Sequence, residues 1–296
     1  MKLLIIFNPN AAFGRSVKRL ALIRSGFEKH GIKAELKATR AAGHGRELVA
    51  KTRLSGYDGL IAAGGDGTVF EVLNGLYQHP KHERIPMGLL PIGTGNAFAR
   101  ELFKKTGDLS EAIKLIQRGT TREVDVGRVS SGKSAFYFIN IVAMGFAVDA
   151  GQTARKIKFF GKSAYTLATL WQVIRLKSYP LVMAIDDNTI NSDNIFVTIS
   201  NSRYTGTHFL IAPDASIDDG QFDVTILEKL PRSRLLRLFP TIYSGRHVEY
   251  KEIASHKASR VRIQSPRGLL LGPDGEFHGC TPAEITCLPG DLEIFA

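Results

Sequence analysis

A cluster of glycines with one aspartate lies where an apolar run meets a helical pattern, and it is the strongest candidate for chemistry in the chain. The run Gly59–Ala63 is typical of a strand, and a helical pattern begins at Val69. The five residues between them are Gly64, Gly65, Asp66, Gly67 and Thr68. Glycines let backbone N–H groups turn toward a ligand, and a helix N-terminus adds positive potential, so this segment predicts an anion site.

Asp66 makes this loop unusual for a phosphate site. A carboxylate would repel a bare phosphate unless a cation lay between them, so the cluster indicates a metal-chelated nucleotide. The plain alternative is a glycine-rich turn in which Asp66 is the helix N-cap, and the motif alone does not separate the two interpretations.

A second loop of the same kind follows about one βαβ unit later. The run Pro86–Ile92 predicts a strand, which is followed by Gly93, Thr94, Gly95 and Asn96. The match to the dinucleotide fingerprint is incomplete, because Phe98 stands at the place of the third glycine. Two such loops on successive strands of one sheet are a sharper signal for nucleotide binding than either loop alone.

The pattern of elements divides the chain into two parts. Up to residue 124, strand and helix patterns alternate with short loops, beginning with strands expected at Lys2–Phe7 and Lys33–Ala38. This alternation predicts a doubly wound, largely parallel α/β sheet. From residue 125 onward, short β-rich runs bounded by turns, among them 135–142 and 268–271, predict an antiparallel β-sandwich. Helices near 162–176 and 233–243 interrupt it. We therefore expect domains at 1–124 and 125–296, and a return of the last residues to the first domain stays open.

The charge of the chain indicates an anionic partner. Lys and Arg number 39 against 28 Asp and Glu, which gives a net charge of +11. Nucleic acid, an acidic membrane surface and a phosphorylated substrate are the candidates. Nucleic acid is the weakest of them, because the chain has no helix-turn-helix, zinc-finger or RNP-like pattern. A solvated basic surface without a partner is the plain alternative.

Hydropathy and cysteine content favour a cytoplasmic protein. No apolar run reaches the roughly 18–20 residues that a membrane span needs, and the apolar stretch at the N-terminus is too short for a signal peptide. The two cysteines, Cys280 and Cys287, form no disulfide framework and do not lie in a zinc-type pair.

Acidic residues at turns and junctions are further candidates. Asp125 lies where the α/β pattern changes to the β pattern, and Glu276 lies in the turn Pro273–Phe277. Asp218 and Asp219 belong to another acidic turn, where carboxylates close to backbone carbonyls could hold a hard cation. Each also has a plain interpretation, as an edge-strand charge or an ordinary turn residue.

These residues occur in one order along nearly the whole chain, and that order carries a family resemblance. The matching residues are Asn8-Pro9, Thr39, Gly64–Thr68 with Glu71 and Asn74-Gly75, Pro91 with Gly93–Asn96 and Phe98–Arg100, Asp125 with Gly127, Pro213-Asp214 with Asp218–Gly220, and Asp274–Glu276. The chain resembles diacylglycerol kinase-type lipid kinases, in the bacterial soluble branch related to sphingosine and ceramide kinases. The resemblance implies a nucleotide-binding α/β domain, a β-sandwich lipid-binding domain and an active site in the cleft between the domains.

The resemblance also implies roles for individual residues. The Asp66 loop would hold the phosphates of ATP and, through water, Mg²⁺, and Asp125 would join Asp66 in ordering the metal. Glu276 would be the general base, and Asp219 with the carbonyls of Ser216 and Gln221 would hold a structural Mg²⁺. The nucleotide-binding residues implied by the motifs are Asn8, Thr39, Gly64, Gly65, Asp66, Gly67, Thr68, Gly93, Thr94, Gly95 and Asn96.

Two apolar stripes at helical spacing have basic residues around them. The first contains Ala164, Leu167, Ala168, Leu170, Trp171 and Ile174, and the second contains Leu235, Leu236, Leu238 and Phe239. Core packing is the commoner meaning of such stripes, and peripheral docking on anionic lipid is the alternative.

The main hypothesis is an ATP- and Mg²⁺-dependent lipid kinase that converts diacylglycerol to phosphatidic acid. It would be cytoplasmic, with peripheral association to the inner face of the membrane, and would bind no nucleic acid; a homodimer stays open. A soluble-metabolite kinase of the NAD kinase type is the alternative, because such kinases share the motif at Gly64–Thr68. A catalytically silent nucleotide-binding regulator is a third hypothesis.

Overall fold

The computed structural model describes residues 1–103, 108–157, 164–206 and 209–296, and the start of the helix expected at 162–176 lies outside these ranges. The chain divides into two compact units. Unit 1 consists of Met1–Val126, Tyr137–Ile139 and Pro289–Ala296, and unit 2 consists of Gly127–Phe136 and Asn140–Leu288.

Unit 1 is built on a parallel sheet with the strand order β4-β3-β1-β2. The strands are β1 (Lys2–Phe7), β2 (Lys33–Ala38), β3 (Gly59–Gly64) and β4 (Met87–Pro91). Every residue of β3 and β4 is buried, which explains their unbroken apolar and glycine sequence, since both faces of a parallel sheet are covered. The chain passes from β1 to β2 on one side and returns to β3 on the other, which confirms the doubly wound fold.

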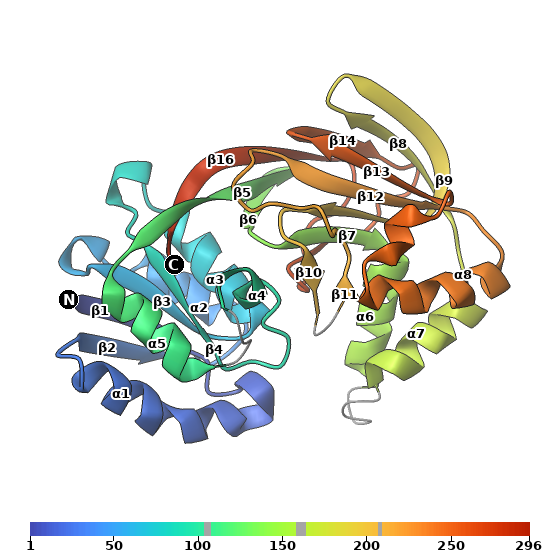
Figure 1. The fold of residues 1–296 in the computed structure, drawn as a ribbon. Helices are drawn as coiled ribbons and strands as arrows, with labels where there is room; N and C mark the ends of the chain where they lie inside the picture. Colours follow the sequence, from blue (N-terminus) through green and yellow to red (C-terminus); the bar gives the residue numbers. More distant parts are fainter. Residues whose placement is uncertain (104–107, 158–163, 207–208) are drawn as a thin grey trace. The chain divides into compact units, whose positions relative to one another are not determined.

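Helices cover both faces of this sheet, with α1 (Leu20–Glu28) beside α5 (Leu109–Arg118) and α2 (His44–Ala50) beside α3 (Asp66–Leu76) (Figure 1). Glycine allows the second pair to approach closely, because a Cβ on Gly75 would lie 2.6 Å from Cβ of Val49. The remaining helical segments of the unit are α4 (Ala99–Leu102) and the 3₁₀ segments η1 (Ala11–Arg19), η2 (Leu54–Gly56) and η3 (Lys81–Glu83).

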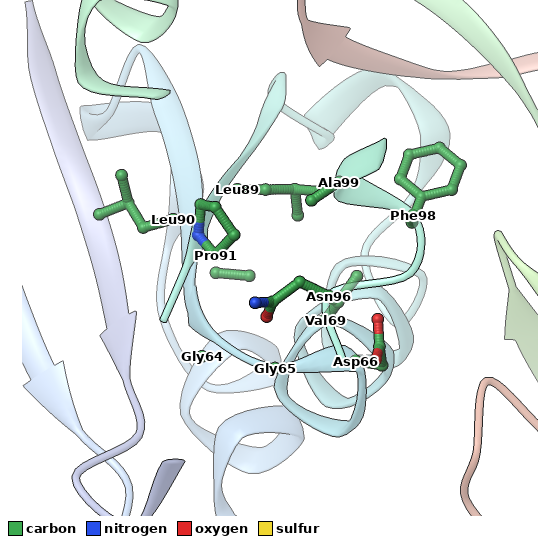
Figure 2. Close-up of a pocket in the computed structure, with 11 residues that line it drawn as sticks. Gly64, Gly65, Asp66, Val69, Leu89, Leu90, Pro91, Asn96, Phe98 and Ala99 are labelled. Atoms are coloured by element: carbon green, nitrogen blue, oxygen red, sulfur yellow. The ribbon is translucent and has the colours of Figure 1, made fainter. Parts of the chain in front are cut away.

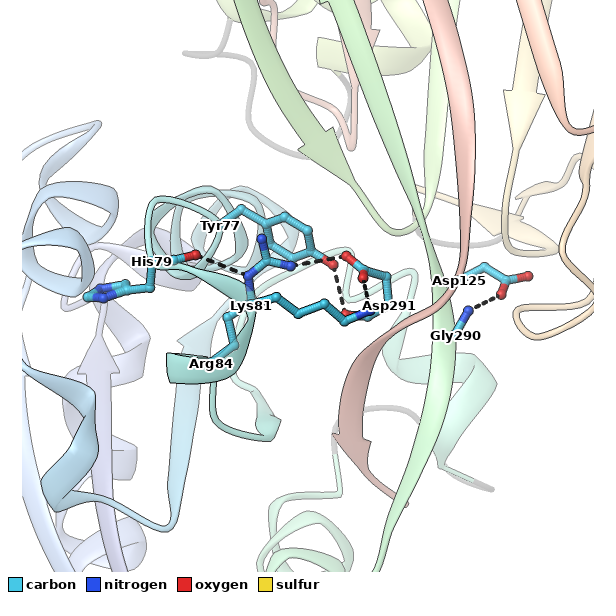
Figure 3. A network of polar contacts seen from close by, with 7 residues as sticks. All are labelled: Tyr77, His79, Lys81, Arg84, Asp125, Gly290 and Asp291. Carbon is cyan, nitrogen blue, oxygen red and sulfur yellow. Dashed lines mark hydrogen bonds and ion pairs between the residues drawn. The ribbon is translucent and has the colours of Figure 1, made fainter.

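The C-terminal residues belong to unit 1 and are held there by a polar network (Figure 3). The Asp291 carboxylate forms ion pairs with Lys81 at 2.7 Å and with Arg84 at 3.0 Å. The Tyr77 hydroxyl donates to the Asp291 carbonyl at 3.2 Å, and the Arg84 guanidinium lies 3.9 Å from the centroid of the Tyr77 ring. Ile294 completes the attachment, because it pairs with Met87 of β4.

Unit 2 is an antiparallel β-structure in which β13, β12, β9, β8, β14 and β16 lie in that order. The long strand β9 pairs with β8 along its first half and with β7 and β12 along its second. The strands that contribute residues to this unit are β5 (Thr121–Ser131), β6 (Ser134–Phe138), β7 (Ile141–Gly145), β8 (Tyr179–Ile185), β9 (Asn188–Ser200), β10 (Tyr204–Thr205), β11 (Phe209–Leu210), β12 (Phe222–Glu228), β13 (Ile253–Ala258), β14 (Arg260–Gln264), β15 (Gly272–Pro273) and β16 (Ala283–Phe295).

Three helices gather at one end of unit 2 (Figure 1). They are α6 (Phe146–Lys156), α7 (Ala164–Ile174) and α8 (Arg232–Leu238), followed by the 3₁₀ segments η5 (Phe239–Tyr243) and η6 (Arg246–Glu249). Val173 of α7 and Leu235 of α8 join the same hydrophobic core as Ile195 and Leu227 of the sheet. Within the described ranges, no helix has the length and hydropathy needed to cross a membrane.

Two local expectations in the second half were wrong. The β-run expected over 135–142 is divided into β6 and β7, and α6 follows at Phe146 where no helix was expected. Gly145 marks the helix start, and its φ of +74° is a conformation that favours glycine. The β-run expected at 268–271 is also absent, since Leu270 makes only an isolated bridge to Cys280.

Candidate active site

The loops that follow β1 and β3 meet at the carboxyl edge of the parallel sheet. The Asn8 side chain donates from Nδ2 to Oγ1 of Thr68 at 3.0 Å, and the Asn8 backbone N–H donates to the Ala63 carbonyl at 2.9 Å. The chain reverses its lateral direction between these two strands, and ligands of open α/β sheets bind at that switch point. The structure therefore joins the expected Asn8 and Thr68 at the place where a nucleotide would bind.

The loops that follow β3 and β4 are in backbone contact. A Cβ on Gly93 would lie 2.3 Å from Cα of Gly65, and the Gly93 N–H donates to the Gly64 carbonyl at 3.0 Å. Asn96 holds the second loop closed, because its amide accepts from the Gly93 N–H at 3.1 Å and donates to the Gly93 carbonyl at 3.0 Å. Only glycine fits at Gly93, so the two loops present one continuous stretch of backbone.

Asp66 links the same two loops through its side chain. The cap of α3 is Gly65 rather than Asp66, so the interpretation of Asp66 as the N-cap was wrong. Its carboxylate instead accepts from the backbone N–H of Ala97, in the second loop, at 2.7 Å. Burial raises the pKa of Asp66 to about 6, against the opposing effect of hydrogen bonds from backbone N–H groups, including that of Ala97. A nearby cation would favour its ionised form.

A small pocket opens beside these loops (Figure 2). Asp66 and Asn96 contribute its polar lining, whereas Val69, Leu89 and Phe98 are among its apolar residues. A pocket with a mostly apolar wall and a few convergent polar groups is typical of a small-molecule site.

The other expected nucleotide residues lie on or near the same loops. Thr39 follows β2, is 7% exposed and donates its backbone N–H to the Phe7 carbonyl at 2.8 Å. Thr94 is exposed and Gly95 half-buried in the second loop, and Gly67 is half-buried in the first. Glu71, which the sequence motif contains without a stated role, accepts from the N–H groups of Gly43 at 2.7 Å and Gly45 at 2.8 Å, so it fixes the loop that follows β2.

Asp125 lies on β5 and is 1% exposed. Its Oδ1 accepts from the Gly290 N–H at 2.8 Å, which attaches the C-terminal residues to β5 (Figure 3). This contact gives Asp125 a structural function, and its role in ordering a metal stays a prediction.

Glu276 stands at the end of a tight turn in unit 2. The Glu276 N–H donates to the Pro273 carbonyl at 2.7 Å, and Asp274 and Gly275 have φ values of +47° and +82°. Positive φ at both central residues is the type I′ pattern, which Asp-Gly favours. The buried Asp274 carboxylate anchors the turn, because it accepts from the N–H groups of Asn140 at 3.0 Å and Ile141 at 2.9 Å.

Arg155 orients the Glu276 side chain and was not anticipated from the sequence. Its guanidinium forms an ion pair with Glu276 at 2.9 Å, donates to the Gly275 carbonyl at 3.0 Å and lies 4.3 Å from the centroid of the Phe277 ring. Three contacts to one turn make it a positioning residue. In the sequence Arg155 is only a basic residue, and nothing near it indicates a contact with Glu276. The helix α6 that carries it was not expected.

The acidic turn proposed for a structural metal is held by a lysine. Asp219 accepts from the Gln221 N–H at 3.1 Å, and its other oxygen lies 2.8 Å from Nζ of Lys257. The same ammonium lies 2.9 Å from the Asp223 carboxylate, whereas the Ser216 hydroxyl donates to Asp218 at 2.6 Å. Lys257 therefore supplies positive charge where Mg²⁺ was expected, and the metal assignment of Ser216, Asp219 and Gln221 stays a prediction.

The residues around Asp66 suit a hard cation better than the Asp219 turn does. Asp66 offers a carboxylate whose pKa burial raises, next to backbone positions that could receive phosphate oxygens. In the part of the chain that the structure describes, no group of three or more His, Cys, Asp or Glu is arranged to hold a metal. A metal at Asp66 would thus take most of its remaining ligands from water and phosphate, as Mg²⁺ commonly does.

Two family models match the chain, one for each part. The diacylglycerol kinase catalytic domain matches residues 2–129, and the YegS C-terminal NAD kinase beta sandwich-like domain matches residues 140–296. A diacylglycerol kinase of Mycobacterium tuberculosis (strain H37Rv) is 31% identical over 99% of this chain and 94% of its own. One from Bacillus subtilis (strain 168) is 32% identical over 98% of this chain and 94% of its own. The chain belongs to the diacylglycerol kinase family.

Solved structures support the fold of this kinase. Two structures of Bacillus anthracis proteins named after diacylglycerol kinase match it with TM-scores of 0.82 and 0.81, each at 26% identity. Each match covers 99% of this chain. The first covers 94% of the solved protein, and the second covers 96%. The expected combination of an α/β domain with a β-sandwich-like domain, and the assignment as a kinase, are confirmed.

Proposed function

We propose that this kinase transfers the γ-phosphoryl group of Mg²⁺-bound ATP to the free hydroxyl of diacylglycerol, giving phosphatidic acid and ADP. The observation that carries the proposal is the contact between the Gly65 and Gly93 loops, with Asp66 bridging them. The names of the full-length relatives support diacylglycerol as the acceptor.

The glycine loops serve the nucleotide. Phosphoryl transfer depends mainly on positioning and charge stabilisation, so closely placed backbone N–H groups suit the phosphates of ATP. Asp66 would hold Mg²⁺, directly or through water, and when bound this ion neutralises charge that develops on the β- and γ-phosphates. Asn8 and Thr68 brace the loop that carries Asp66, because their side chains are hydrogen-bonded to each other.

Glu276 serves the acceptor. A lipid hydroxyl is a poor nucleophile, and a positioned carboxylate that accepts its proton contributes roughly 10²- to 10⁴-fold. The bond that forms joins the hydroxyl oxygen to the γ-phosphorus, and the bond that breaks joins the γ-phosphorus to the oxygen bridging it to the β-phosphate. The proton passes to Glu276, which the I′ turn and Arg155 hold in one orientation.

The lipid acceptor implies work at a membrane. We expect a cytoplasmic enzyme that associates peripherally with the inner face of the membrane, supported by the net charge of +11.

The test is transfer of label from radiolabelled ATP to diacylglycerol in anionic vesicles, with and without Mg²⁺. We expect labelled phosphatidic acid that requires Mg²⁺ and is lost in Asp66→Asn. The matched control is Asp187→Asn, which changes an exposed aspartate in the turn between β8 and β9 and should leave activity unchanged. Labelling of NAD in place of the lipid would instead support a soluble-metabolite kinase and refute the proposal.

A further inference from the structure

Helix α7 turns a stripe of large apolar side chains to the solvent. The α7 stripe consists of Leu167, Leu170, Trp171 and Ile174, with exposed fractions of 41%, 49%, 48% and 65%. Their spacing places them on one side of the helix, whereas Ala168, Thr169 and Val173 are buried at 0%, 5% and 5%. Core packing, the commoner meaning of such a stripe, was therefore wrong for its four largest members; the side chain of Ala164 lies outside the described residues.

The positive charge of the chain is concentrated around this stripe. Residues 150–185 contain six Lys or Arg and no Asp or Glu, and residues 229–248 contain five Lys or Arg and no Asp or Glu. Those 11 basic residues leave 28 Lys and Arg elsewhere, which balance the 28 Asp and Glu. The whole net charge of +11 thus arises from these two segments; Lys158 and Lys162 among them lie outside the described residues.

The two segments come together in unit 2. Helix α7 packs against α8 through the core that contains Val173 and Leu235, and Gln172 of α7 donates to Thr153 of α6 at 2.8 Å. Figure 1 shows α6, α7 and α8 gathered at one end of the unit. The described basic residues of the two segments and the exposed apolar stripe therefore belong to one helical cluster rather than to scattered parts of the surface.

Many of the basic side chains in this cluster are available to an external anion. Arg155, Arg234 and Arg246 pair with acidic residues. Among the residues that the structure describes, the exposed basic side chains that form no ion pair are those of Lys156, Arg175, Lys177, Lys229, Arg232 and Arg237. The Arg175 guanidinium lies 5.0 Å from the centroid of the Trp171 ring, so charge and apolar surface meet at the stripe itself.

We infer that the α7 stripe and the basic residues around it form the surface by which this kinase docks on an anionic lipid bilayer. Apolar side chains of an interfacial helix enter the headgroup region, and lysines and arginines beside it bind lipid phosphates. The two segments, which contain 11 Lys and Arg and no Asp or Glu, suit an anionic sheet of headgroups. The inference rests on the proposed function, because diacylglycerol resides in the bilayer, and it adds the face that meets the lipid.

The chain carries its own reporter for the test, since Trp171 is its one tryptophan. We would titrate the full-length protein, without ATP, with phosphatidylcholine vesicles and with vesicles that also contain phosphatidylglycerol. The expected result is a blue shift of Trp171 fluorescence with the anionic vesicles only, quenching by brominated acyl chains, and weaker binding as salt rises. An unshifted spectrum with anionic vesicles would overturn the inference.

Matched variants locate the surface. Ile174→Asp and the double change Arg175→Glu with Lys177→Glu should each weaken binding to anionic vesicles at least about tenfold. The controls are Leu22→Asp and Lys114→Glu, which alter an exposed leucine and an exposed lysine on helices of unit 1 and should bind like wild type. Equal losses in the controls, or wild-type binding by the stripe variants, would overturn the assignment.

Activity separates this inference from the proposed function. With a short-chain, water-soluble diacylglycerol the Ile174→Asp variant should turn over at the wild-type rate, whereas on anionic vesicles it should lose most of its rate. Vesicle binding without lipid phosphorylation by any variant would refute the proposed function and leave the docking surface supported. A dimer that Ile174→Asp splits into monomers, together with no vesicle binding, would show that a second copy covers the stripe and would overturn the inference.

Discussion

In the absence of nucleotide, ionisation of Asp66 should lower the free energy of unfolding of this kinase. Comparison of wild type with the variant Asp66→Asn measures that change. Burial raises the pKa of Asp66 from 3.8 to about 6 in the folded protein. Each pKa unit corresponds to about 1.4 kcal/mol, so the ionised carboxylate destabilises the folded state by at most about 3 kcal/mol. The residue is half-buried, so that figure is an upper limit.

The sign follows from proton binding. Between the ordinary pKa of 3.8 and the folded value of about 6, the folded protein holds a proton on Asp66 that the unfolded chain has released. The contribution of Asp66 is therefore fully favourable below pH 3.8 and is lost as the pH rises through about 6. The carboxamide in the Asp66→Asn variant does not titrate, so the free energy of unfolding of wild type minus that of the variant should fall across this window.

The assay is urea unfolding at a series of pH values from about 4 to 8, with EDTA and without nucleotide. Trp171 lies in unit 2, so its fluorescence does not follow the unfolding of unit 1. Hydrogen exchange of amides in β3 and α3 is therefore the measurement for unit 1. Asp58→Asn, an exposed carboxylate in the same unit, is the control for loss of a surface charge. A difference between wild type and Asp66→Asn that stays flat across the pH series would refute the desolvation argument.

Three further outcomes follow from the same geometry. Glu276→Gln should lower kcat at least about 10²-fold with little change in ATP affinity, measured by steady-state kinetics, and an unchanged kcat would remove it from the mechanism. Gly93→Ala should abolish ATP binding in calorimetry, because its Cβ would lie 2.3 Å from backbone, whereas Gly56→Ala meets nothing within 4 Å and should bind normally. Lys257→Met should lower the Tm and make it rise with added Mg²⁺ more than in wild type, because Asp219 and Asp223 lose their shared ammonium; equal responses would contradict this.

Local sequence determined the sheet of unit 1 and the identity of its loops. The strands at Lys2–Phe7 and Lys33–Ala38 have the bounds that the sequence predicts. The first is an apolar run that loop residues end, whereas the second is a polar strand at the exposed edge of the sheet. The glycine clusters at Gly64–Thr68 and Gly93–Asn96 are local signals of the same kind, since their backbone conformations depend on the residues present.

The sequence by itself could not decide which contacts those loops make. Asp66 appeared as a helix cap or a phosphate-site residue, and its bond to the Ala97 N–H exists only because β3 and β4 are neighbours in the sheet. The ion pairs of Asp291 with Lys81 and Arg84 likewise join residues about 200 positions apart. They form because the C-terminal residues return to unit 1. No periodicity within a segment encodes a contact of that range.

Tertiary structure also decided which side of an amphipathic helix faces the core. The apolar spacing in α7 fits a helix that packs inward through Leu167, Leu170, Trp171 and Ile174, yet Val173 takes the place in the core. A helix with apolar residues on more than one side can bury only the side that its neighbours meet, and β9, β12 and α8 set that side. The sequence thus determined that α7 is a helix with surplus apolar surface, and the packing of unit 2 decided that the surplus faces outward.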